Sequence, residues 1–205
     1  MGAGHYFAER PDVVSARRTV TLALPDATLT LQTDRGVFGA GRVDPGTRYL
    51  LLEAPHPPDR GHLLDLGSGY GPVALMMARR APHAVVWAVD VNERARILCA
   101  ENARANGIDN VRSVAPDDVP TDVAFATIWS NPPIRIGKVV LHELLVRWLG
   151  RLEPGAIAHL VVQRHLGADS LAAWLSAHGF PTVRRGSRQA YRLLDVTCDS
   201  STAPA

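Results

Sequence analysis

The sequence predicts a single α/β domain built on a doubly wound, mainly parallel sheet. From residue 61 onward, short apolar runs alternate with amphipathic stretches, which is typical of buried parallel strands joined by covering helices. Helices are expected at 72–80, 93–106, 138–149 and 170–178, and strands at 62–66, 84–89, 111–115, 124–129, 156–162, 183–185 and 190–196. Since no helix separates the last two strands, we expect them to pair antiparallel at one edge of the sheet.

The first 58 residues have a different pattern from the rest and are predicted to form an N-terminal extension. Residues 19–24 and 28–33 alternate apolar and polar side chains around a short turn, which indicates a β-hairpin. Asp44 and Pro45 are suited to the cap and first turn of a short helix that ends near residue 52. We therefore expect an extension at 1–58, the main domain at 59–198 and a disordered tail at 199–205.

Composition limits the function classes. The chain has 205 residues, 46% of them hydrophobic, and a net charge of only +2, which fits one globular domain. Cys99 and Cys198 lie far apart and outside any metal-binding spacing, so we expect no metal site. No stretch approaches the ~20 apolar residues of a membrane span, and we expect a cytoplasmic protein without membrane contact.

A glycine-rich turn follows the first strand of the main domain. Its motif, Asp65-x-Gly67-x-Gly69-x-Gly71, leads directly into a helix, and such turns let backbone amides approach a ligand closely. The carboxylate of Asp65 would repel a dinucleotide pyrophosphate but would suit a ligand that carries an ammonium and a sulfonium. The alternative is that Asp65 only braces the loop.

Acidic residues also follow the next two strands. Asp90 lies about 20 residues beyond the glycine loop, where an acid accepts hydrogen bonds from ribose hydroxyls. The alternative role, capping the following helix, is filled better by Asn92. Asp117 follows the third strand and could hold an adenine amino group, or it could simply belong to a loop turn.

The most informative motif follows the fourth strand and reads Asn131-Pro132-Pro133-Ile134. The prolines remove two backbone donors and leave carbonyl acceptors, and Asn131 adds a side-chain carbonyl at the edge where ligands bind. Two acceptors can hold the N–H groups of a conjugated exocyclic amine and direct its lone pair at an electrophilic methyl group. The motif therefore indicates methyl transfer to nitrogen, with a simple strand-ending turn as the alternative.

Together, the glycine loop, Asp90 and the Asn-Pro-Pro motif resemble the methyltransferase small domain family. Nearly the whole chain shares this resemblance, and the branch it resembles is related to the ribosomal RNA guanine-N2 methyltransferases. The further segments that carry it are His5-Tyr6-Phe7, Gly36-Val37-Phe38, Arg42-Val43-Asp44-x-Gly46-Thr47, Ile134-Arg135-x-Gly137-Lys138 and Gln163-Arg164-x-x-Gly167-Ala168-x-Ser170.

The resemblance implies a class I, Rossmann-like seven-stranded sheet, S-adenosylmethionine as cofactor, and the 2-amino group of a guanine in small-subunit (16S) ribosomal RNA as acceptor. It implies that the target amine is held by Asn131 and Pro132, beside Pro133 and Ile134. It places these residues at the cofactor: Phe38, Thr47, Asp65, Gly67, Ser68, Gly69, Gly71, Asp90, Val91, Asp117 and Asn131. One departure is Ile134, where many relatives have an aromatic residue that stacks on the target base.

Arginine supplies nearly all the positive charge, and Lys138 is the only lysine among 22 basic residues. Arg135, Lys138 and Arg164 follow strand ends at the predicted site and are expected to contact the phosphates of the substrate. A second group, at 184, 185, 188 and 192, could extend this rim or could be scattered solvated side chains.

Two alternatives to ribosomal RNA remain at this point. One is another acceptor, such as a protein glutamine or an adenine or cytosine amine. The other is a non-catalytic nucleotide-binding module, against which the intact Asn-Pro-Pro acceptors argue. The sequence does not determine the oligomeric state.

Overall fold

The computed structural model describes Glu9 and residues 12–199. Seven strands form one sheet in the order β5-β4-β3-β6-β7-β9-β8, and a separate two-stranded sheet contains β1 and β2. The strands are β1 (Arg18–Ala23), β2 (Thr28–Thr33), β3 (His62–Leu66), β4 (Val85–Val89), β5 (Val111–Val114), β6 (Phe125–Ser130), β7 (Leu152–Gln163), β8 (Thr182–Arg188) and β9 (Tyr191–Val196). The predicted class I α/β fold with an N-terminal hairpin is confirmed.

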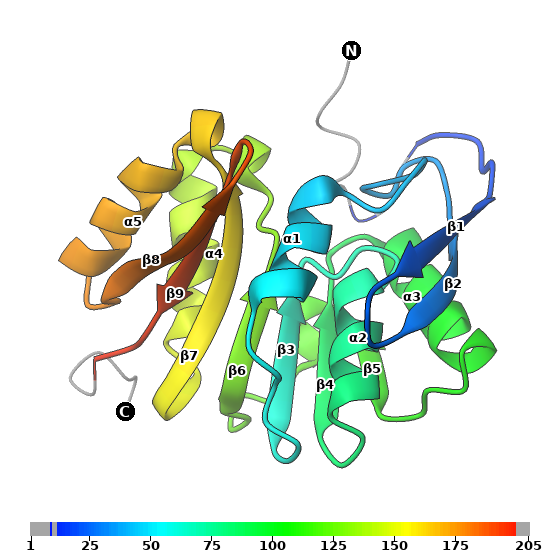
Figure 1. The fold of residues 1–205 in the computed structure, drawn as a ribbon, viewed down its shortest axis with the longest axis horizontal. Coiled ribbons are helices and arrows are strands. Elements are labelled where there is room, and N and C mark those ends of the chain that lie inside the picture. The colour runs from blue at the N-terminus through cyan, green and yellow to red at the C-terminus, as the bar shows by residue number, and fades with distance from the viewer. Residues whose placement is uncertain (1–8, 10–11, 200–205) are drawn as a thin grey trace.

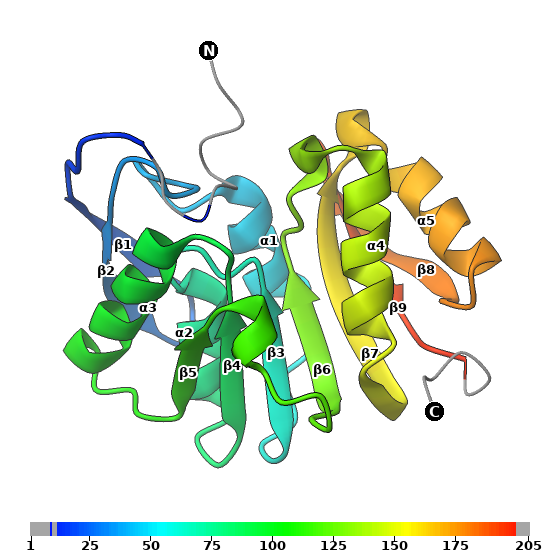
Figure 2. The ribbon, with the colours of Figure 1, turned by 180° about the vertical axis from the view of Figure 1, so that it is seen from behind.

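Helices cover both faces of the large sheet (Figures 1 and 2). One core cluster joins the sheet to the hairpin and to three helices on the same face: α1 (Pro45–Glu53), α2 (Pro72–Arg80) and α3 (Glu93–Ala105). The other cluster joins the opposite face to α4 (Lys138–Leu149) and α5 (Ala168–Ala177). Because residues of the hairpin and α1 belong to the same core cluster as the sheet, the N-terminal extension is held on the face of the sheet that α2 and α3 also cover.

The last two strands pair antiparallel at one edge of the sheet, as predicted. β9 is antiparallel to both β7 and β8 and lies between them, so β8 forms the edge of the sheet. β7 also begins at Leu152, before the expected residue 156, and its pairing with β6 contains an irregularity between Phe125 and Thr127. The start of β7 contains Glu153, Pro154 and Gly155 and is not an apolar run, which explains why the sequence did not show it.

The parallel strands β3, β4, β5 and β6 end at the same edge of the sheet, and the segments that follow them meet there. Ser130, the last residue of β6, ties this edge together, because its buried hydroxyl donates a hydrogen bond of 2.7 Å to the Leu66 carbonyl at the end of β3. This bond places the Asn-Pro-Pro turn beside the glycine loop.

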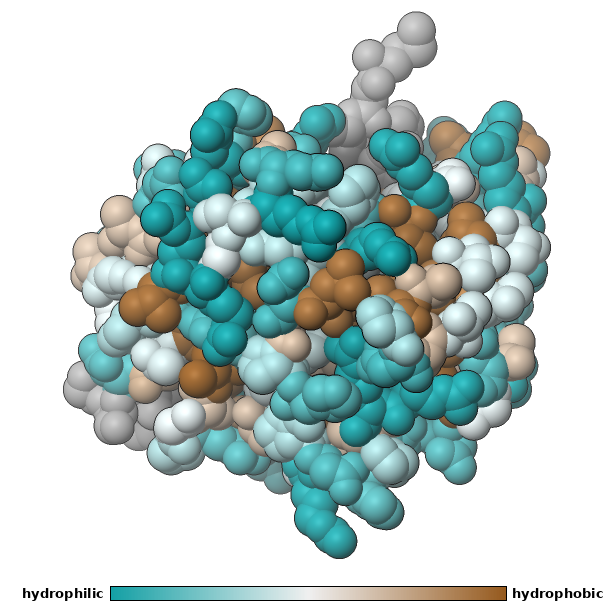
Figure 3. Space-filling view, viewed as in Figure 1, coloured by the Kyte–Doolittle hydropathy of each residue, from teal (hydrophilic) through white to brown (hydrophobic). Residues whose placement is uncertain are grey.

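On the face shown in Figure 3, hydrophobic residues are exposed only in small groups among hydrophilic ones.

None of the helices in the described part of the chain is both long and apolar enough to cross a membrane. Within that same part, no three or more His, Cys, Asp or Glu residues gather in a way that could hold a metal ion. The predicted tail and the His5-Tyr6-Phe7 segment lie outside the described residues, apart from Asp199.

Candidate active site

A cavity of about 340 Å³ opens at the carboxyl edge of the sheet. It brings together residues from the glycine loop, the end of β4, the Asn-Pro-Pro turn and the N-terminal extension. Ten predicted site residues line it: Phe38, Gly67, Gly69, Asp90, Val91, Asn131, Pro132, Pro133, Ile134 and Arg135. A smaller cavity of about 20 Å³ adjoins it and is lined by Thr47, Asp65 and Ser68 among others.

The glycine loop has a conformation that other residues rarely adopt. Gly67 has φ +77°, in the left-handed region, and the backbone amides of Gly67 and Ser68 both donate to the Val89 carbonyl at the end of β4. At Gly71, with φ +97°, a Cβ atom would lie only 2.7 Å from Cys99 Sγ. Gly71 therefore permits close packing of the loop on α3, and it does not line either cavity.

Asp65 lies beneath the glycine loop and is buried. Its Oδ2 accepts a hydrogen bond of 2.8 Å from the amide of Ala74 in the first turn of α2, so it braces the loop. It also lines the small cavity, where it could face a ligand ammonium. Burial raises the pKa of the Asp65 carboxyl to about 8.

The raised pKa gives Asp65 a measurable effect on stability. The folded state favours the protonated carboxyl, so the contribution of Asp65 to stability falls as the pH rises from the ordinary pKa of 3.8 to about 8. Asp65→Asn stays neutral and keeps a carbonyl acceptor for Ala74. We expect the unfolding free energy of Asp65→Asn, relative to the parent, to increase between pH 5 and 8 and to level off above 8. Urea unfolding across this range measures it, and parallel curves for the two proteins would refute the raised pKa.

Asp90 directly follows β4 and lines the cavity. Its Oδ2 accepts from the Gly69 amide and its Oδ1 from the Asn92 amide, each at 2.8 Å. Burial raises the pKa of the Asp90 carboxyl, while these two amides lower it. Each carboxylate oxygen retains a further lone pair, so Asp90 can hold ribose hydroxyls while it fixes the glycine loop.

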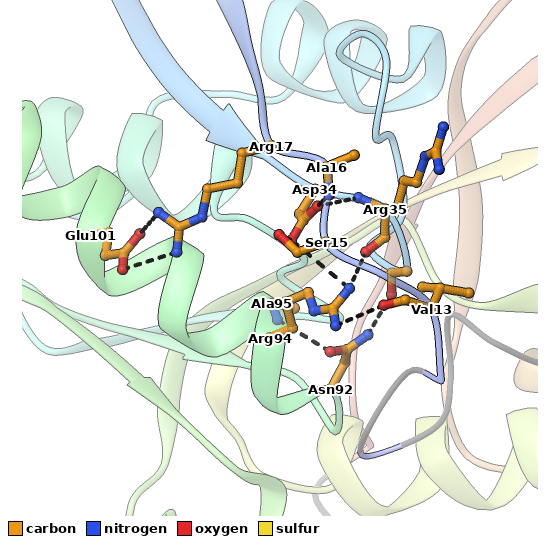
Figure 4. Close-up of polar contacts among 11 residues, drawn as sticks. Val13, Ser15, Ala16, Arg17, Asp34, Arg35, Asn92, Arg94, Ala95 and Glu101 are labelled. Atoms are coloured by element: carbon orange, nitrogen blue, oxygen red, sulfur yellow. Dashed lines mark hydrogen bonds and ion pairs between the residues drawn. The ribbon is translucent and has the colours of Figure 1, made fainter.

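The N-terminal extension supplies one wall of the cavity. Figure 4 shows the polar contacts that hold this extension to the start of α3. The Asn92 side chain donates to the Gly36 carbonyl at 2.7 Å, and Arg94 donates to the carbonyls of Arg35 and Val13 at 2.7 and 3.0 Å. The two residues that follow Gly36 line the cavity. Residues at the start of α3 thus hold in place the wall segment, which lines the cavity together with the glycine loop.

The residues of the Asn-Pro-Pro turn line the cavity. Pro133 has φ −76° and ψ 70°, and the Ile134 amide donates to the Pro132 carbonyl at 2.9 Å, which forms an inverse γ-turn. One lone pair of the Pro132 carbonyl is thereby used and one remains. The side-chain nitrogen of Asn131 donates to Asp44 Oδ1 at 2.8 Å and to Thr47 Oγ at 3.1 Å.

Besides Gly71, three predicted residues do not line either cavity. The Asp117 side chain is 90% exposed and pairs with Arg147 at 2.8 Å, and the neighbouring Pro116 lines the cavity in its place. Lys138 and Arg164 also lie outside the lining, and both follow segments that reach it. In the second arginine group, Arg185, Arg188 and Arg192 face acidic partners, namely Asp195, Glu53 and Asp169.

Sequence reasoning missed several lining residues, of which Asp44, Gln163 and Tyr191 are polar and reach the Asn131 end of the cavity. Asp44 carried a visible signal, but it indicated a helix cap. Gln163 ends β7 and Tyr191 begins β9, directly opposite in the antiparallel register. The antiparallel insertion of β9 brings Tyr191 to the site, and no local pattern indicates it.

The residues at the glycine loop fit the cofactor that the sequence resemblance implied. The buried Ser68 hydroxyl and the Tyr70 hydroxyl have no hydrogen-bond partner within the described structure, and both residues line the small cavity. Unpaired buried hydroxyls beside a glycine loop and two carboxylates suit the charged, polar methionyl end and the ribose of S-adenosylmethionine.

The model of the family described as the methyltransferase small domain matches residues 28–189. The chain belongs to this family. It is an S-adenosylmethionine-dependent methyltransferase, and the fold and cofactor expected from the sequence are confirmed.

Among similar proteins, the methyltransferase is 38% identical over 169 residues to the uncharacterized protein YbxB of Bacillus subtilis, covering 81% of this chain and 84% of that one. It is 32% identical over 173 residues to ribosomal RNA small subunit methyltransferase C of Pseudomonas aeruginosa, covering 77% of this chain and 51% of the relative. The chain thus spans about half the length of the matched ribosomal RNA methyltransferases.

Two solved structures share the fold of this chain. The T. thermophilus 16S rRNA N2 G1207 methyltransferase, in complex with AdoMet and guanosine, superimposes with a TM-score of 0.76 at 25% identity, covering 92% of this chain and 52% of that one. M. jannaschii TYW2, in complex with AdoMet, has a TM-score of 0.55 at 14% identity and shows only the shared fold.

Proposed function

We propose that this methyltransferase methylates the exocyclic 2-amino group of a guanine in small-subunit ribosomal RNA. The observation that carries the proposal is that the glycine loop and the neutral acceptors Asn131 and Pro132 line the same cavity. Relatives and a solved neighbour named as 16S or small-subunit ribosomal RNA methyltransferases support this acceptor.

The residues of the site favour alignment over acid–base catalysis. S-adenosylmethionine, when bound by the glycine loop and Asp90, supplies an electrophilic methyl group. Asn131 Oδ1 and the free lone pair of the Pro132 carbonyl can each accept one N–H of the amine, which turns the nitrogen lone pair out of conjugation and toward the methyl group. Correct placement of reacting groups accounts for much of such rate enhancements. The amine can release its proton after it becomes an acidic ammonium, so no strong base is required.

The walls around these acceptors favour a nucleobase over a flexible glutamine side chain. Tyr191 provides an aromatic ring at the acceptor end of the cavity, which the aliphatic Ile134 does not. Gln163, on the neighbouring strand, offers both a donor and an acceptor and lies 3.5 Å from the Tyr191 hydroxyl. A flat ring with polar edges matches this combination of stacking surface and carboxamide.

A basic rim at the mouth can hold the RNA backbone. Arg135 lines the cavity and Lys138 begins α4 three residues later, and neither has an ion-pair partner in the described part of the chain. We propose that both contact phosphates, with Arg164 after β7 as a third contact. The paired arginines of β8 and β9 are less suited to this role because their charges are already compensated.

Replacing Arg135 and Lys138 by alanine should weaken RNA binding and reduce its salt dependence. Each phosphate contact releases counterions, so the slope of log affinity against log salt should fall by about 1 to 2 when two contacts are lost. Binding of S-adenosylmethionine should be unchanged. Filter binding at several salt concentrations measures the slope, and Arg184→Ala, on the exposed edge strand, is the matched control. Equal slopes in the double variant and the parent would remove both residues from the RNA interface.

The acceptor itself is tested by transfer of a tritium-labelled methyl group to naked 16S ribosomal RNA, intact small subunits, DNA and protein extract. We expect label in ribosomal RNA, as N2-methylguanosine after nuclease digestion. Label in protein glutamine, or in an adenine or cytosine, would replace the proposed acceptor. The absence of transfer to every substrate, with S-adenosylmethionine bound, would favour a non-catalytic module.

A further inference from the structure

Asp44 makes more contacts than a helix cap requires. As the N-cap of α1, its Oδ1 accepts from the amides of Gly46 at 2.8 Å and Thr47 at 3.1 Å. The same oxygen also accepts from Asn131 Nδ2 at 2.8 Å, across a separation of 87 residues in sequence. A serine or threonine would satisfy the helix end equally well, so capping alone does not explain the contact with Asn131.

This contact determines which end of the Asn131 amide faces the cavity. A carboxylate only accepts hydrogen bonds, so the Asn131 nitrogen must face Asp44. Thr47 Oγ takes the second N–H of the same nitrogen. With both N–H groups used, the carbonyl oxygen is directed to the other side, where Asn131 lines the cavity. In the reverse orientation the amide would present N–H donors to the N–H donors of an amine.

The structure also prevents Asp44 from shifting. A Cβ atom at Gly46 would lie 2.5 Å from the ring of Tyr191, so the first turn of α1 packs directly on β9. The cap is therefore held between its own helix and the sheet. Asp44 belongs to the N-terminal extension and Asn131 directly follows β6, and both of these elements are fixed in the core.

We propose that Asp44 is a positioning residue for methyl transfer: it holds the Asn131 carboxamide with its oxygen toward the acceptor amine. The inference rests on the role proposed for Asn131. It assigns a catalytic contribution to the N-terminal extension, because α1 and its cap bring the carboxylate to the cavity.

The test is Asp44→Ser, which keeps a capping oxygen for α1 but, being one atom shorter, loses the bond to Asn131. We expect kcat for transfer to small subunits to fall about 10- to 100-fold, as for a misplaced reacting group. KM, the affinity for S-adenosylmethionine and the thermal midpoint should change little. Asp44→Ala, which also removes the cap, should lower the midpoint in addition.

A double-mutant cycle with Asn131→Ala separates positioning from a structural role. If Asp44 acts through Asn131, Asp44→Ser should have no further effect on kcat once Asn131 is alanine. Equal losses in both backgrounds would overturn the proposal and leave Asp44 as a structural residue. A normal rate for Asn131→Ala alone would instead overturn the proposed function, so the two failures are distinguishable.

A measurement without substrate completes the test. The Asn131 side-chain amide, assigned in ¹H–¹⁵N spectra by its loss in Asn131→Ala, should exchange slowly with water because both N–H groups are bonded. Asp44→Ser should accelerate this exchange while the Ser130 and Gly69 backbone signals stay in place. An unchanged side-chain signal in Asp44→Ser would contradict the proposal.

Discussion

Replacing Asn131 by alanine should lower the single-turnover rate of methyl transfer by ~10²–10³, the usual cost of removing one preorganised transition-state hydrogen bond. The variant deletes one of the two acceptors proposed for the amine. The amides of the glycine loop are held by Val89 and Asp90, whereas the Asn131 side chain bonds to Asp44 and Thr47. Affinity for S-adenosylmethionine should therefore stay within a few-fold of the parent, as measured by calorimetry.

Asn131→Asp is a poor conservative control because of Asp44. It would place a second carboxylate against Asp44 Oδ1, where the parent has a bond of 2.8 Å. Two carboxylates so close resist joint ionisation, so the variant should be slow and should depend on pH. The parent should instead show a flat pH–rate profile between about 7 and 9, since no tuned acid–base pair is required. A parental single-turnover rate for Asn131→Ala would refute its role and remove the main support for an amino-directed enzyme.

Most of the fold could be predicted because its elements are encoded locally. Buried parallel strands form continuous apolar runs, and two of the helices, α1 and α3, begin at recognisable caps, Asp44 and Asn92. The details that the sequence did not show depend on contacts between distant segments. The early start of β7 is hidden by Gly155 and an irregular pairing, and the position of β9 between β7 and β8 follows from packing.

The same division applies to the site. Residues in motifs at strand ends, such as Gly67, Asp90 and Asn131, could be predicted because parallel strands end at one edge. Tyr191 could not, because an antiparallel strand brings it to the cavity from the far end of the chain. Asp117 was expected at the adenine from its place after β5, but a short turn directs its side chain into solvent. Sequence position after a strand does not determine side-chain direction in a turn.

Asp90→Ala should weaken S-adenosylmethionine binding by about 10- to 150-fold. A hydrogen bond to a charged group contributes ~1.5–3 kcal/mol, and the variant removes the proposed acceptor of the ribose hydroxyls. It also leaves the Gly69 and Asn92 amides without the carboxylate. Calorimetric titration gives the dissociation constant, and an unchanged value would remove Asp90 from the cofactor site.

The loss of ribose contact must be separated from disturbance of the loop. S-adenosylhomocysteine and its 2′-deoxy and 3′-deoxy analogues provide the control, because they differ only in the hydroxyls that Asp90 is proposed to bind. If Asp90 accepts from the ribose, the parent should discriminate against at least one deoxy analogue and Asp90→Ala should not. If the variant weakens all three ligands equally, Asp90 acts by holding the Gly69 amide in place. Because the carboxylate oxygens each retain a lone pair beside these amides, we expect the first result.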